Sequence, residues 1–458
     1  MAKKLIPLAV PDVGKEELEE INKVFTTGFL TEGTTTKEFE KTVAEYLGVK
    51  HAIAVTSCTT GLHTVLECLN VKGKDVIIPD YTYPATAEAV LLAGGNPVLV
   101  DVDLESMNMT AHTLEESFEE GMNVFSPVSW AGVPLESDLY KTAKKLGLIC
   151  LEDAACSLGA KIGNDFVGKI ADFSCFSFHP RKIITTGEGG MITTNNESIA
   201  ESCYSFKHFG AKGSSFEIVG TNYKMSNVLS AIGLVQMQKI ESIIKMRNEK
   251  AKIFQELLSP IKDIKPAYVG KGTRQTFQSY TCYVEKEGYR DKIRTALADE
   301  NIQNQIGTYA LHLEPAYKKL RHIGNLSNSE KLFLPNAPKK LSCSNNKLIN
   351  IPNLPNSLQE LYCHNNQLTS LPDLPNSLQI LVCSGNQLIS LPDLPNSLKT
   401  LWCDFNQITE IPNNLPDSIE TFYLCGNNIE LAPTKWPKCL REVSCDSKTK
   451  KLLPKKLL

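Results

Sequence analysis

Short apolar runs alternate with amphipathic stretches through the first half of the 458-residue chain. Each run is rich in β-branched residues and is followed by a loop and then by a stretch with helical spacing, of which 137–145 is the clearest. This alternation is typical of parallel strands covered by helices on both faces of a sheet. The four clearest runs are 76–79, 97–103, 123–128 and 148–153. The pattern predicts an α/β domain over residues 1–240, with its ligand site beyond the carboxyl ends of the strands.

The pattern changes after residue 240. An amphipathic helix is predicted over 240–258, a strand over 278–284 and a second helix over 290–300. This mixture predicts a smaller α+β domain over residues 241–333.

A 20-residue repeat fills the last quarter of the chain. The pattern Leu-x-x-Leu-x-Cys-x-x-Asn-x-Leu recurs at 358–368, 378–388 and 398–408, with weaker copies before and after. It resembles a leucine-rich repeat, in which each copy gives one strand of a solenoid. We expect a solenoid over residues 338–458 that offers a surface to a protein partner. Its inward positions and its asparagine ladder would be Leu361, Leu381, Leu401, Cys343, Cys363, Cys383, Cys403, Asn366, Asn386 and Asn406.

Composition narrows the class of protein. The formal net charge is −3, so no basic excess favours nucleic acid or an anionic membrane surface as a partner. No apolar stretch reaches the roughly 18 residues of a membrane span, and the amino-terminal apolar run is too short for a signal peptide. The 14 cysteines contain no Cys-x-x-Cys pair, which favours reduced thiols, no metal site and a cytoplasmic location.

One lysine has the surroundings of a reactive amine. Lys182 follows an apolar run and precedes a glycine-rich turn in Ser-Phe-His-Pro-Arg-Lys-Ile-Ile-Thr-Thr-Gly-Glu-Gly-Gly, residues 177–190. An amine held there can form a Schiff base with an aldehyde cofactor. The segment resembles the lysine motif of the DegT/DnrJ/EryC1/StrS family of pyridoxal-phosphate sugar aminotransferases, and the resemblance extends over residues 1–333. It implies a fold of the aspartate aminotransferase type (fold type I), with Lys182 as Schiff-base lysine and general acid and base.

A second family motif lies upstream of Lys182. Residues 151–160, Leu-Glu-Asp-Ala-Ala-Cys-Ser-Leu-Gly-Ala, resemble a family segment whose aspartate binds the pyridine nitrogen, which assigns that role to Asp153. A helix N-cap is the alternative interpretation of Asp153. Cys156 replaces the glutamine or histidine that in the family lies near the phenolic oxygen of the cofactor. Ser129 likewise stands where the family often has histidine.

The resemblance also implies a phosphate cradle and a stacking ring. Residues 56–62 resemble the Ser-Gly-Thr loop of the family, which points to Thr59 and Thr60, and Ser177 would bind the phosphate from the lysine side. By itself, the loop is equally explained as an ordinary helix N-cap. Tyr83 matches the aromatic residue that stacks on the cofactor, and a core tyrosine is the alternative.

Two further segments imply contacts with a second subunit and with substrate. Residues 220–226 resemble a family segment whose asparagine reaches the cofactor phosphate of the neighbouring subunit, so Asn222 implies a homodimer with shared active sites. Lys224 replaces the usual arginine there. It keeps the positive charge but cannot make the paired hydrogen bonds of a guanidinium group. Tyr309 and His312 lie in a loop similar to a substrate-side loop of the family and are candidates for sugar contacts.

The function implied is transfer of an amino group from glutamate to a nucleotide-linked keto sugar. We expect a dTDP-4-keto-6-deoxyhexose aminated at C4, with amination at C3 as the alternative. One alternative is a pyridoxal-phosphate sugar dehydratase, in which histidine replaces the lysine of the family; the presence of Lys182 counts against it. Another is an inactive pyridoxal-phosphate fold that binds a protein through its repeats. This second alternative stays open because the small domain, compared with the family, looks truncated where the repeats begin, at residues 334–338.

Overall fold

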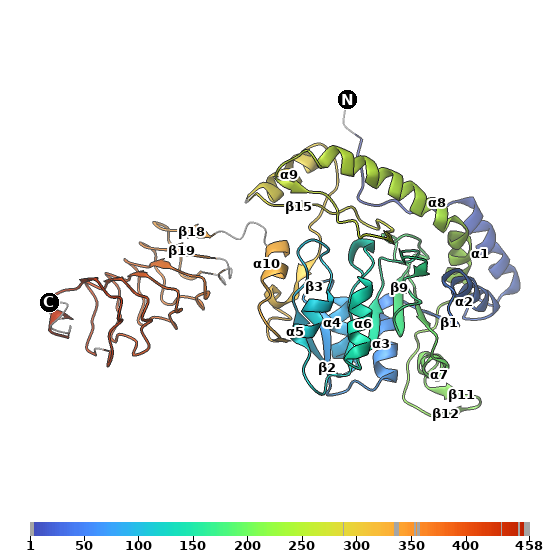
Figure 1. Cartoon of the computed structure of the whole chain (residues 1–458), viewed down its shortest axis with the longest axis horizontal. Helices are drawn as coiled ribbons and strands as arrows, with labels where there is room; N and C mark the ends of the chain where they lie inside the picture. Colours follow the sequence, from blue (N-terminus) through green and yellow to red (C-terminus); the bar gives the residue numbers. More distant parts are fainter. Residues whose placement is uncertain are drawn as a thin grey trace. The chain divides into compact units, whose positions relative to one another are not determined.

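The computed structural model describes residues 4–286, 288–333, 339–351, 354, 358–431, 433–447 and 449–452. The chain divides into two compact units, Met1–Pro335 and Asn336–Leu458. Figure 1 shows both, coloured from blue at the amino terminus to red at the carboxyl terminus. Each unit has hydrophobic clusters of its own. The expected junction at 334–338 lies outside the described residues.

An eight-stranded sheet forms the centre of the first unit. Its strands are, in spatial order, β1 (His51–Val55), β10 (Gly190–Thr194), β9 (Phe173–Ser177), β6 (Ile149–Asp153), β5 (Val124–Phe125), β2 (Asp75–Pro79), β4 (Asn96–Val100) and β17 (Arg321–His322). The strands from β9 to β17 pair in parallel, as the sequence predicted, but β10 is antiparallel to both of its neighbours. The reversal has a local cause: residues 178–189 form a loop without a crossover helix, so the chain returns directly beside β9.

Helices cover both faces of this sheet (Figure 1). One face packs against α3 (Cys58–Cys68), α4 (Ala85–Leu92) and α7 (Glu197–Lys207). The other face packs against α2 (Thr34–Leu47), α5 (Ala111–Ser117), α6 (Ser137–Lys145) and α8 (Asn227–Leu258). The alternation along β1 shows how the strands serve both layers, because Ile53 packs with the first group whereas Ala52 and Ala54 pack with the second. Helix α1 (Lys15–Thr27) lies against α8.

Helix α8 connects the large sheet to the smaller part of the first unit. It begins at Asn227 rather than at residue 240, because Ser226 caps it by accepting from the Leu229 N–H at 3.3 Å. The strand expected over 278–284 is short: only β15 (Tyr283–Val284) forms, paired with β13 (Ile264–Lys265). The second expected helix is α9 (Tyr289–Asp299), and none of its residues is buried.

The remaining elements of the first unit are short. They are β3 (Tyr81–Thr82), η1 (Trp130–Gly132), β7 (Lys161–Ile162), β8 (Asp165–Phe166), β11 (Ala211–Lys212), β12 (Ser215–Phe216), β14 (Thr273–Arg274), β16 (Tyr309–Ala310), η2 (Leu311–Leu313) and α10 (Ser327–Phe333). Among the described residues, no helix combines the length and the apolarity that crossing a bilayer requires.

The second unit is a parallel sheet of six three-residue strands in sequence order. They are β18 (Lys340–Ser342), β19 (Glu360–Tyr362), β20 (Ile380–Val382), β21 (Thr400–Trp402), β22 (Thr421–Tyr423) and β23 (Glu442–Ser444), followed by a 3-10 turn, η3 (Thr449–Leu452). The expected inward leucines and the cysteines two residues after them are at most 1 % exposed: Leu361, Leu381, Leu401, Cys363, Cys383 and Cys403. Cys343, in the first copy, is only partly buried.

A column of asparagines joins successive repeats. The Asn386 side chain donates to the carbonyl oxygens of Cys363 and Cys383, both at 3.0 Å, and accepts from the Leu368 N–H at 3.0 Å. Asn366 and Asn406 make the equivalent bonds one repeat before and after. The expected asparagine ladder is therefore present, and it satisfies turn groups that would otherwise be buried without a partner.

Candidate active site

The carboxyl ends of β6 and β9 lie side by side because these strands pair in parallel. Strand β6 ends at Asp153 and β9 ends at Ser177, just before the loop that carries Lys182. Helix α3, which begins at Cys58, packs against both strands. The topology therefore gathers segments far apart in sequence at the edge of the sheet where α/β proteins bind ligands.

Lys182 lies partly buried next to Cys156. The Lys182 Nζ is 3.3 Å from the Cys156 Sγ. Burial, the largest single influence, lowers the pKa of Lys182, but Cys156, Asp153 and Cys58 together raise that pKa above the ordinary value for lysine. The amine is thus held among groups from three separate segments.

Asp153 is almost completely buried, and both of its carboxylate oxygens have partners. The Thr86 Oγ1 donates to Oδ2 at 2.8 Å, and the Ala155 N–H donates to Oδ1 at 3.1 Å. The Cys58 Sγ lies 3.8 Å from the same Oδ1. Burial raises the pKa of Asp153, while these donors and Lys182 limit the rise. No helix begins at Asp153, since β6 leads through a turn into β7, so the N-cap interpretation is wrong.

The first turn of α3 forms the expected cradle segment. Ser57 caps the helix and accepts from the Thr60 N–H at 3.1 Å, while Thr59, the second residue of α3, is half-buried. The first N–H groups of a helix lack intrahelical partners and carry the positive end of the dipole, so this end suits a phosphate. Strand β10 approaches it closely: a Cβ on Gly190 would lie 2.4 Å from the Ser57 carbonyl carbon, which only glycine avoids. Ser177, on β9, accepts from the His179 N–H at 3.3 Å.

Tyr83 and Tyr309 lie next to each other at this edge. Strands β3 and β16 pair, and the two rings have centroids 6.5 Å apart. Tyr83 is 67 % exposed, so it is not a core residue. Two aromatic rings therefore stand at the surface where a cofactor and a substrate were expected.

His312 is held between two carboxylates. Its Nδ1 is 2.7 Å from the Asp80 Oδ2, and its Nε2 is 3.2 Å from the Glu330 Oε1. Burial, the largest influence, lowers the pKa of His312, but the two carboxylates outweigh it and raise the pKa to about 9. Both ring nitrogens thus contact protein groups, and the histidine links the start of β3 to α10.

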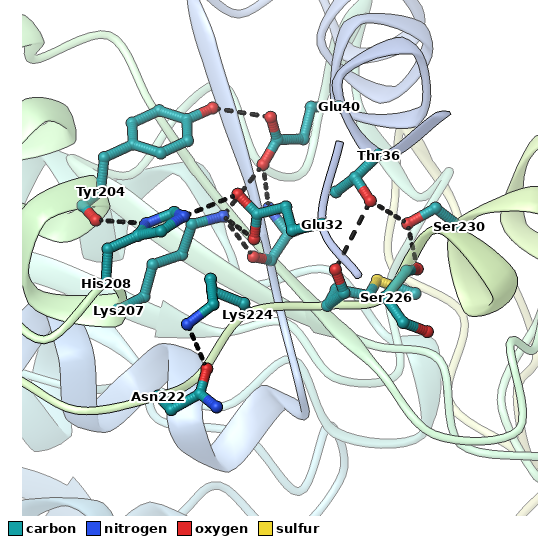
Figure 2. A network of polar contacts seen from close by, with 12 residues as sticks. Glu32, Thr36, Glu40, Tyr204, Lys207, His208, Asn222, Lys224, Ser226 and Ser230 are labelled. Atoms are coloured by element: carbon teal, nitrogen blue, oxygen red, sulfur yellow. Dashed lines mark hydrogen bonds and ion pairs between the residues drawn. The ribbon is translucent and has the colours of Figure 1, made fainter. Parts of the chain in front are cut away.

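Asn222 and Lys224 lie at the rim of a polar network (Figure 2). The Lys224 Nζ donates to the Asn222 Oδ1 at 2.5 Å, and Asn222 is exposed. Deeper in the network, the fully buried Lys207 lies 3.1 Å from Glu32 and 3.3 Å from Glu40. Buried charges are tolerated when they are paired and hydrogen-bonded in this way. The segment that carries Asn222 joins this network through its backbone, because the Tyr223 N–H donates to the Lys207 carbonyl oxygen at 3.2 Å.

Ser129 does not point toward Lys182. It is fully buried and donates to Glu152, which also accepts from the Tyr140 hydroxyl at 3.0 Å. Burial, the largest influence, raises the pKa of Glu152 to about 7, although both hydroxyls lower it. Glu152 precedes Asp153 on β6 and so faces the opposite side of the sheet.

The sequence does not reveal the direct partners of Asp153. Thr86 and Cys58 lie inside the segments 79–86 and 56–62, but nothing local indicates that their side chains reach Asp153. That information lies in the packing of α3 against β6 and of α4 against α3.

The residues at this edge fit pyridoxal phosphate. The buried Asp153 carboxylate suits a protonated ring nitrogen. The charge of Asp153 acts on the Lys182 amine and raises its pKa. The amino terminus of α3, with its hydroxyl side chains, suits a phosphate. The exposed ring of Tyr83 lies three residues before Thr86, which binds Asp153. This set of groups defines the class of pyridoxal-phosphate-dependent aminotransferases.

Comparison with known proteins identifies the family within that class. The family model described as the DegT/DnrJ/EryC1/StrS aminotransferase family matches residues 11–335, and the chain belongs to this family. The chain is 33 % identical over 325 residues to the GDP-perosamine synthase of Caulobacter vibrioides, covering 69 % of this chain and 87 % of the relative.

Solved structures agree with this assignment. PseC of Helicobacter pylori, an aminotransferase involved in pseudoaminic acid biosynthesis, is similar with a TM-score of 0.68 and 26 % identity, covering 72 % of this chain and 92 % of that one. The pyridoxal-phosphate form of the sugar aminotransferase Spr1654 from Streptococcus pneumoniae is similar with a TM-score of 0.67 and 26 % identity, covering 72 % and 91 %. The chain is therefore a pyridoxal-phosphate-dependent sugar aminotransferase by family, with a second unit outside the matched region.

Proposed function

We propose that this chain transfers an amino group from glutamate to C4 of a nucleotide-linked 4-keto-6-deoxyhexose, with dTDP as the nucleotide. The observation that carries the proposal is the partly buried Lys182 amine in the electrostatic field of the buried Asp153 carboxylate. Pairs of titratable groups whose environments shift their pKa values are typical of catalytic sites. Membership of the family supports the nucleotide-sugar substrate class.

Each group in the candidate site has a proposed task toward the cofactor. When bound, pyridoxal phosphate supplies an aldehyde and a ring that accepts electrons. Asp153 holds a proton on the ring nitrogen, and Thr86 keeps its carboxylate oriented. The start of α3, with Thr59, Thr60 and Ser177, binds the phosphate.

Lys182 anchors the cofactor and moves the proton. Its amine binds the cofactor aldehyde, and during transfer it carries a proton between the donor carbon and the cofactor carbon as general base and then general acid. Cys156 lies within reach of the same amine and limits where it can point. Tyr83 covers the ring and keeps water away from it.

The substrate groups are assigned to the exposed rim. Tyr309, beside Tyr83, is the candidate for packing against the sugar ring. Lys224 offers a cation for an anionic group, and Asn222 lies beside it to reach the cofactor phosphate of a second subunit. His312 orders the loop that carries Tyr309 by binding the carboxylates of Asp80 and Glu330. Only the edge of its ring is left to contact the sugar.

The half-reaction with glutamate tests the proposal. Purified chain loaded with pyridoxal phosphate should convert glutamate to 2-oxoglutarate once per site without any sugar, and dTDP-4-keto-6-deoxyglucose should then restore turnover. Mass spectrometry and NMR of the product should place nitrogen at C4. A GDP-linked keto sugar that reacts faster would overturn the choice of dTDP. A product that has lost water without gaining nitrogen would establish the dehydratase, and no 2-oxoglutarate despite bound cofactor would establish the inactive fold.

Shared active sites are tested by mixing inactive chains. Lys182→Ala and Asn222→Asp chains should regain activity together, because one of the two sites in a mixed dimer is intact. The aspartate is chosen because its charge repels a phosphate. Tagged chains show whether mixed dimers form, and mixed dimers without any activity would refute the shared site.

For the second unit we propose the leucine-rich-repeat assignment, with a protein as its partner. The asparagine ladder supports it, and so does an aromatic pair on the strand face: the Trp402 and Tyr423 rings stack with centroids 5.1 Å apart, and Trp402 is 39 % exposed. Exposed tryptophan and tyrosine are enriched where proteins bind one another. Trp402→Ala should abolish capture of a partner identified with the wild-type chain, whereas Ile389→Ala, an exposed change elsewhere, should not.

A further inference from the structure

The contact between Lys182 and Cys156 concerns two reactive groups. The Lys182 Nζ lies 3.3 Å from the Cys156 Sγ, and both side chains are partly buried, so a small oxidant can reach them. Cysteines beside a cationic group and open to solvent are those that peroxide attacks. The amine is thus positioned to react with whatever the sulfur becomes.

The surrounding structure holds this pair in place. The Thr276 Oγ1 donates to the Cys156 carbonyl oxygen at 2.9 Å, and the Lys182 N–H donates to the His179 carbonyl oxygen at 2.8 Å. Two other sulfurs of the site, Cys58 and Cys175, are buried. Of these three thiols, Cys156 is the one that combines access with the nearby amine.

We propose that Cys156 and Lys182 form an oxidative modification site, in which hydrogen peroxide joins them by a sulfur–nitrogen bond and so removes the amine. The cross-link itself depends only on the contact, whereas its effect on activity rests on the proposed function of Lys182. In the chain without cofactor, oxidation blocks the Lys182 amine, and thiols release it again.

The chemistry balances in two steps. The Cys156 sulfur attacks one peroxide oxygen; an S–O bond forms, the O–O bond breaks, and the released hydroxide takes the thiol proton to become water. The sulfur is oxidised to a sulfenic acid and the peroxide is reduced. The Lys182 ammonium group first loses its extra proton to water, and the neutral amine then attacks the sulfur; an N–S bond forms, the S–O bond breaks, and hydroxide leaves as water with a proton from the amine. A thiol reductant reverses the product by attack on sulfur, which releases the amine and ends as a disulfide of the reductant.

Peptide mapping tests the cross-link directly. The full chain, without added cofactor, is treated with a small excess of peroxide, blocked with a thiol reagent and digested with trypsin without reductant. The expected product joins peptide 146–161, which holds Cys156, to peptide 182–207 with no cleavage after Lys182, two hydrogen atoms lighter than the sum of the two peptides. Dithiothreitol should restore both the separate peptides and the cleavage. Pyridoxal phosphate added before peroxide should prevent the reaction by occupying Lys182.

Matched variants identify the atoms. Cys156→Ser should abolish the product, whereas Cys150→Ala, a change in the same peptide, should leave it unchanged. A disulfide through Cys203 is a separate event, since its sulfur lies 3.8 Å from that of Cys68, and it would leave cleavage after Lys182 intact. In Lys182→Arg, Cys156 should stop at the sulfenic acid and react with dimedone.

The outcomes separate this proposal from the proposed function. Dimedone labelling of Cys156 in the wild-type chain at full yield, with normal cleavage after Lys182, would overturn the cross-link even if transamination is active. A cross-link in a chain that converts no glutamate would support the modification and refute the catalytic assignment. In an active chain, the cross-linked fraction and the lost activity should be equal, and both should return with dithiothreitol.

Discussion

The two units of this chain assemble their sheets in opposite ways. In the first unit, β10 lies between β1 and β9, and β6 pairs with β9, so neighbours in space are distant in sequence. In the second unit, all six strands pair in sequence order. The first arrangement brings unlike residues to one edge of a sheet, whereas the second repeats one set of contacts. We therefore expect changes at the edge of the first sheet to affect chemistry, and changes inside the second to affect stability.

The buried polar groups show the same contrast. In the first unit, Asp153 has Thr86 and Ala155 as partners, and Lys207 has Glu32 and Glu40. Within the described part of the chain, neither set of contacts is repeated elsewhere along a regular pattern. In the second unit, each ladder asparagine makes the same three bonds to its neighbours. Unique buried polar groups are typical of functional sites, and repeated ones of structural support.

The largest expected effect is that of Lys182→Ala. Activity should fall by at least about 10⁴-fold, the upper range of general acid–base catalysis, because both the anchor and the proton carrier are lost. Borohydride treatment of the loaded wild-type chain should attach the cofactor covalently, seen as an added mass, and the variant should gain none. Thermal unfolding of the second unit should be unchanged. Covalent attachment in the variant would assign the anchoring role to another lysine.

Asp153→Asn should have the next largest effect. Activity should fall by about 10²–10³-fold, the range for removal of a preorganised electrostatic contact, while the cofactor remains bound. Thr86→Val, which removes the donor to Oδ2, should give a smaller loss and a shifted pH profile of kcat. Equal activity of Asp153→Asn and wild type would leave the carboxylate with a structural role only.

Changes inside the second unit test the other side of the comparison. Leu381→Ala removes a fully buried side chain and should lower the free energy of unfolding of that unit by about 2–5 kcal/mol. Asn386→Ala leaves three carbonyls and one N–H without this partner and should cost about 1–3 kcal/mol. Gln387→Ala, at an exposed neighbouring position, is the control and should cost little. Chemical denaturation with the Trp402 fluorescence as probe measures all three, and a parallel loss of transamination would show that the units depend on each other.

The sequence predicted what short segments contain. The motif around Lys182, the strand ending at Asp153 and the repeat period each depend on residues close together in the chain, and the corresponding elements form where they were expected. Helix α6 even has the predicted bounds, because its apolar spacing is uninterrupted from Ser137 to Lys145.

What the sequence could not predict depends on packing between distant segments. The antiparallel course of β10 depends on a loop that lacks a helix, which no periodicity reveals. The contact of Thr86 with Asp153 depends on the packing of α4 against α3, β2 and β4, which brings the start of α4 to the end of β6. The ion pairs of His312 require Asp80, 232 residues before it, and Glu330, 18 residues after it. Side-chain partners across a sheet edge are set by topology, and local patterns do not carry that information.

The last expected effect concerns how the stability of the first unit changes with pH. The pKa of His312 in the folded chain is about 9, above its ordinary value of 6.5, because Asp80 and Glu330 outweigh burial. The stabilisation by the proton is therefore complete below about pH 6.5 and is lost as the pH rises through 9. The free-energy advantage of the wild type over His312→Asn should shrink over this window by up to about 3.4 kcal/mol, which is the shift from 6.5 to about 9 at 1.36 kcal/mol per pKa unit. Glu330→Gln should narrow this pH window from its upper end, since it removes one of the two carboxylates.

Denaturant unfolding at several pH values measures this, with the transition of the second unit as internal reference because His312 is not part of it. An advantage that stays constant from pH 6 to 10 would mean that the histidine contributes through neutral hydrogen bonds alone.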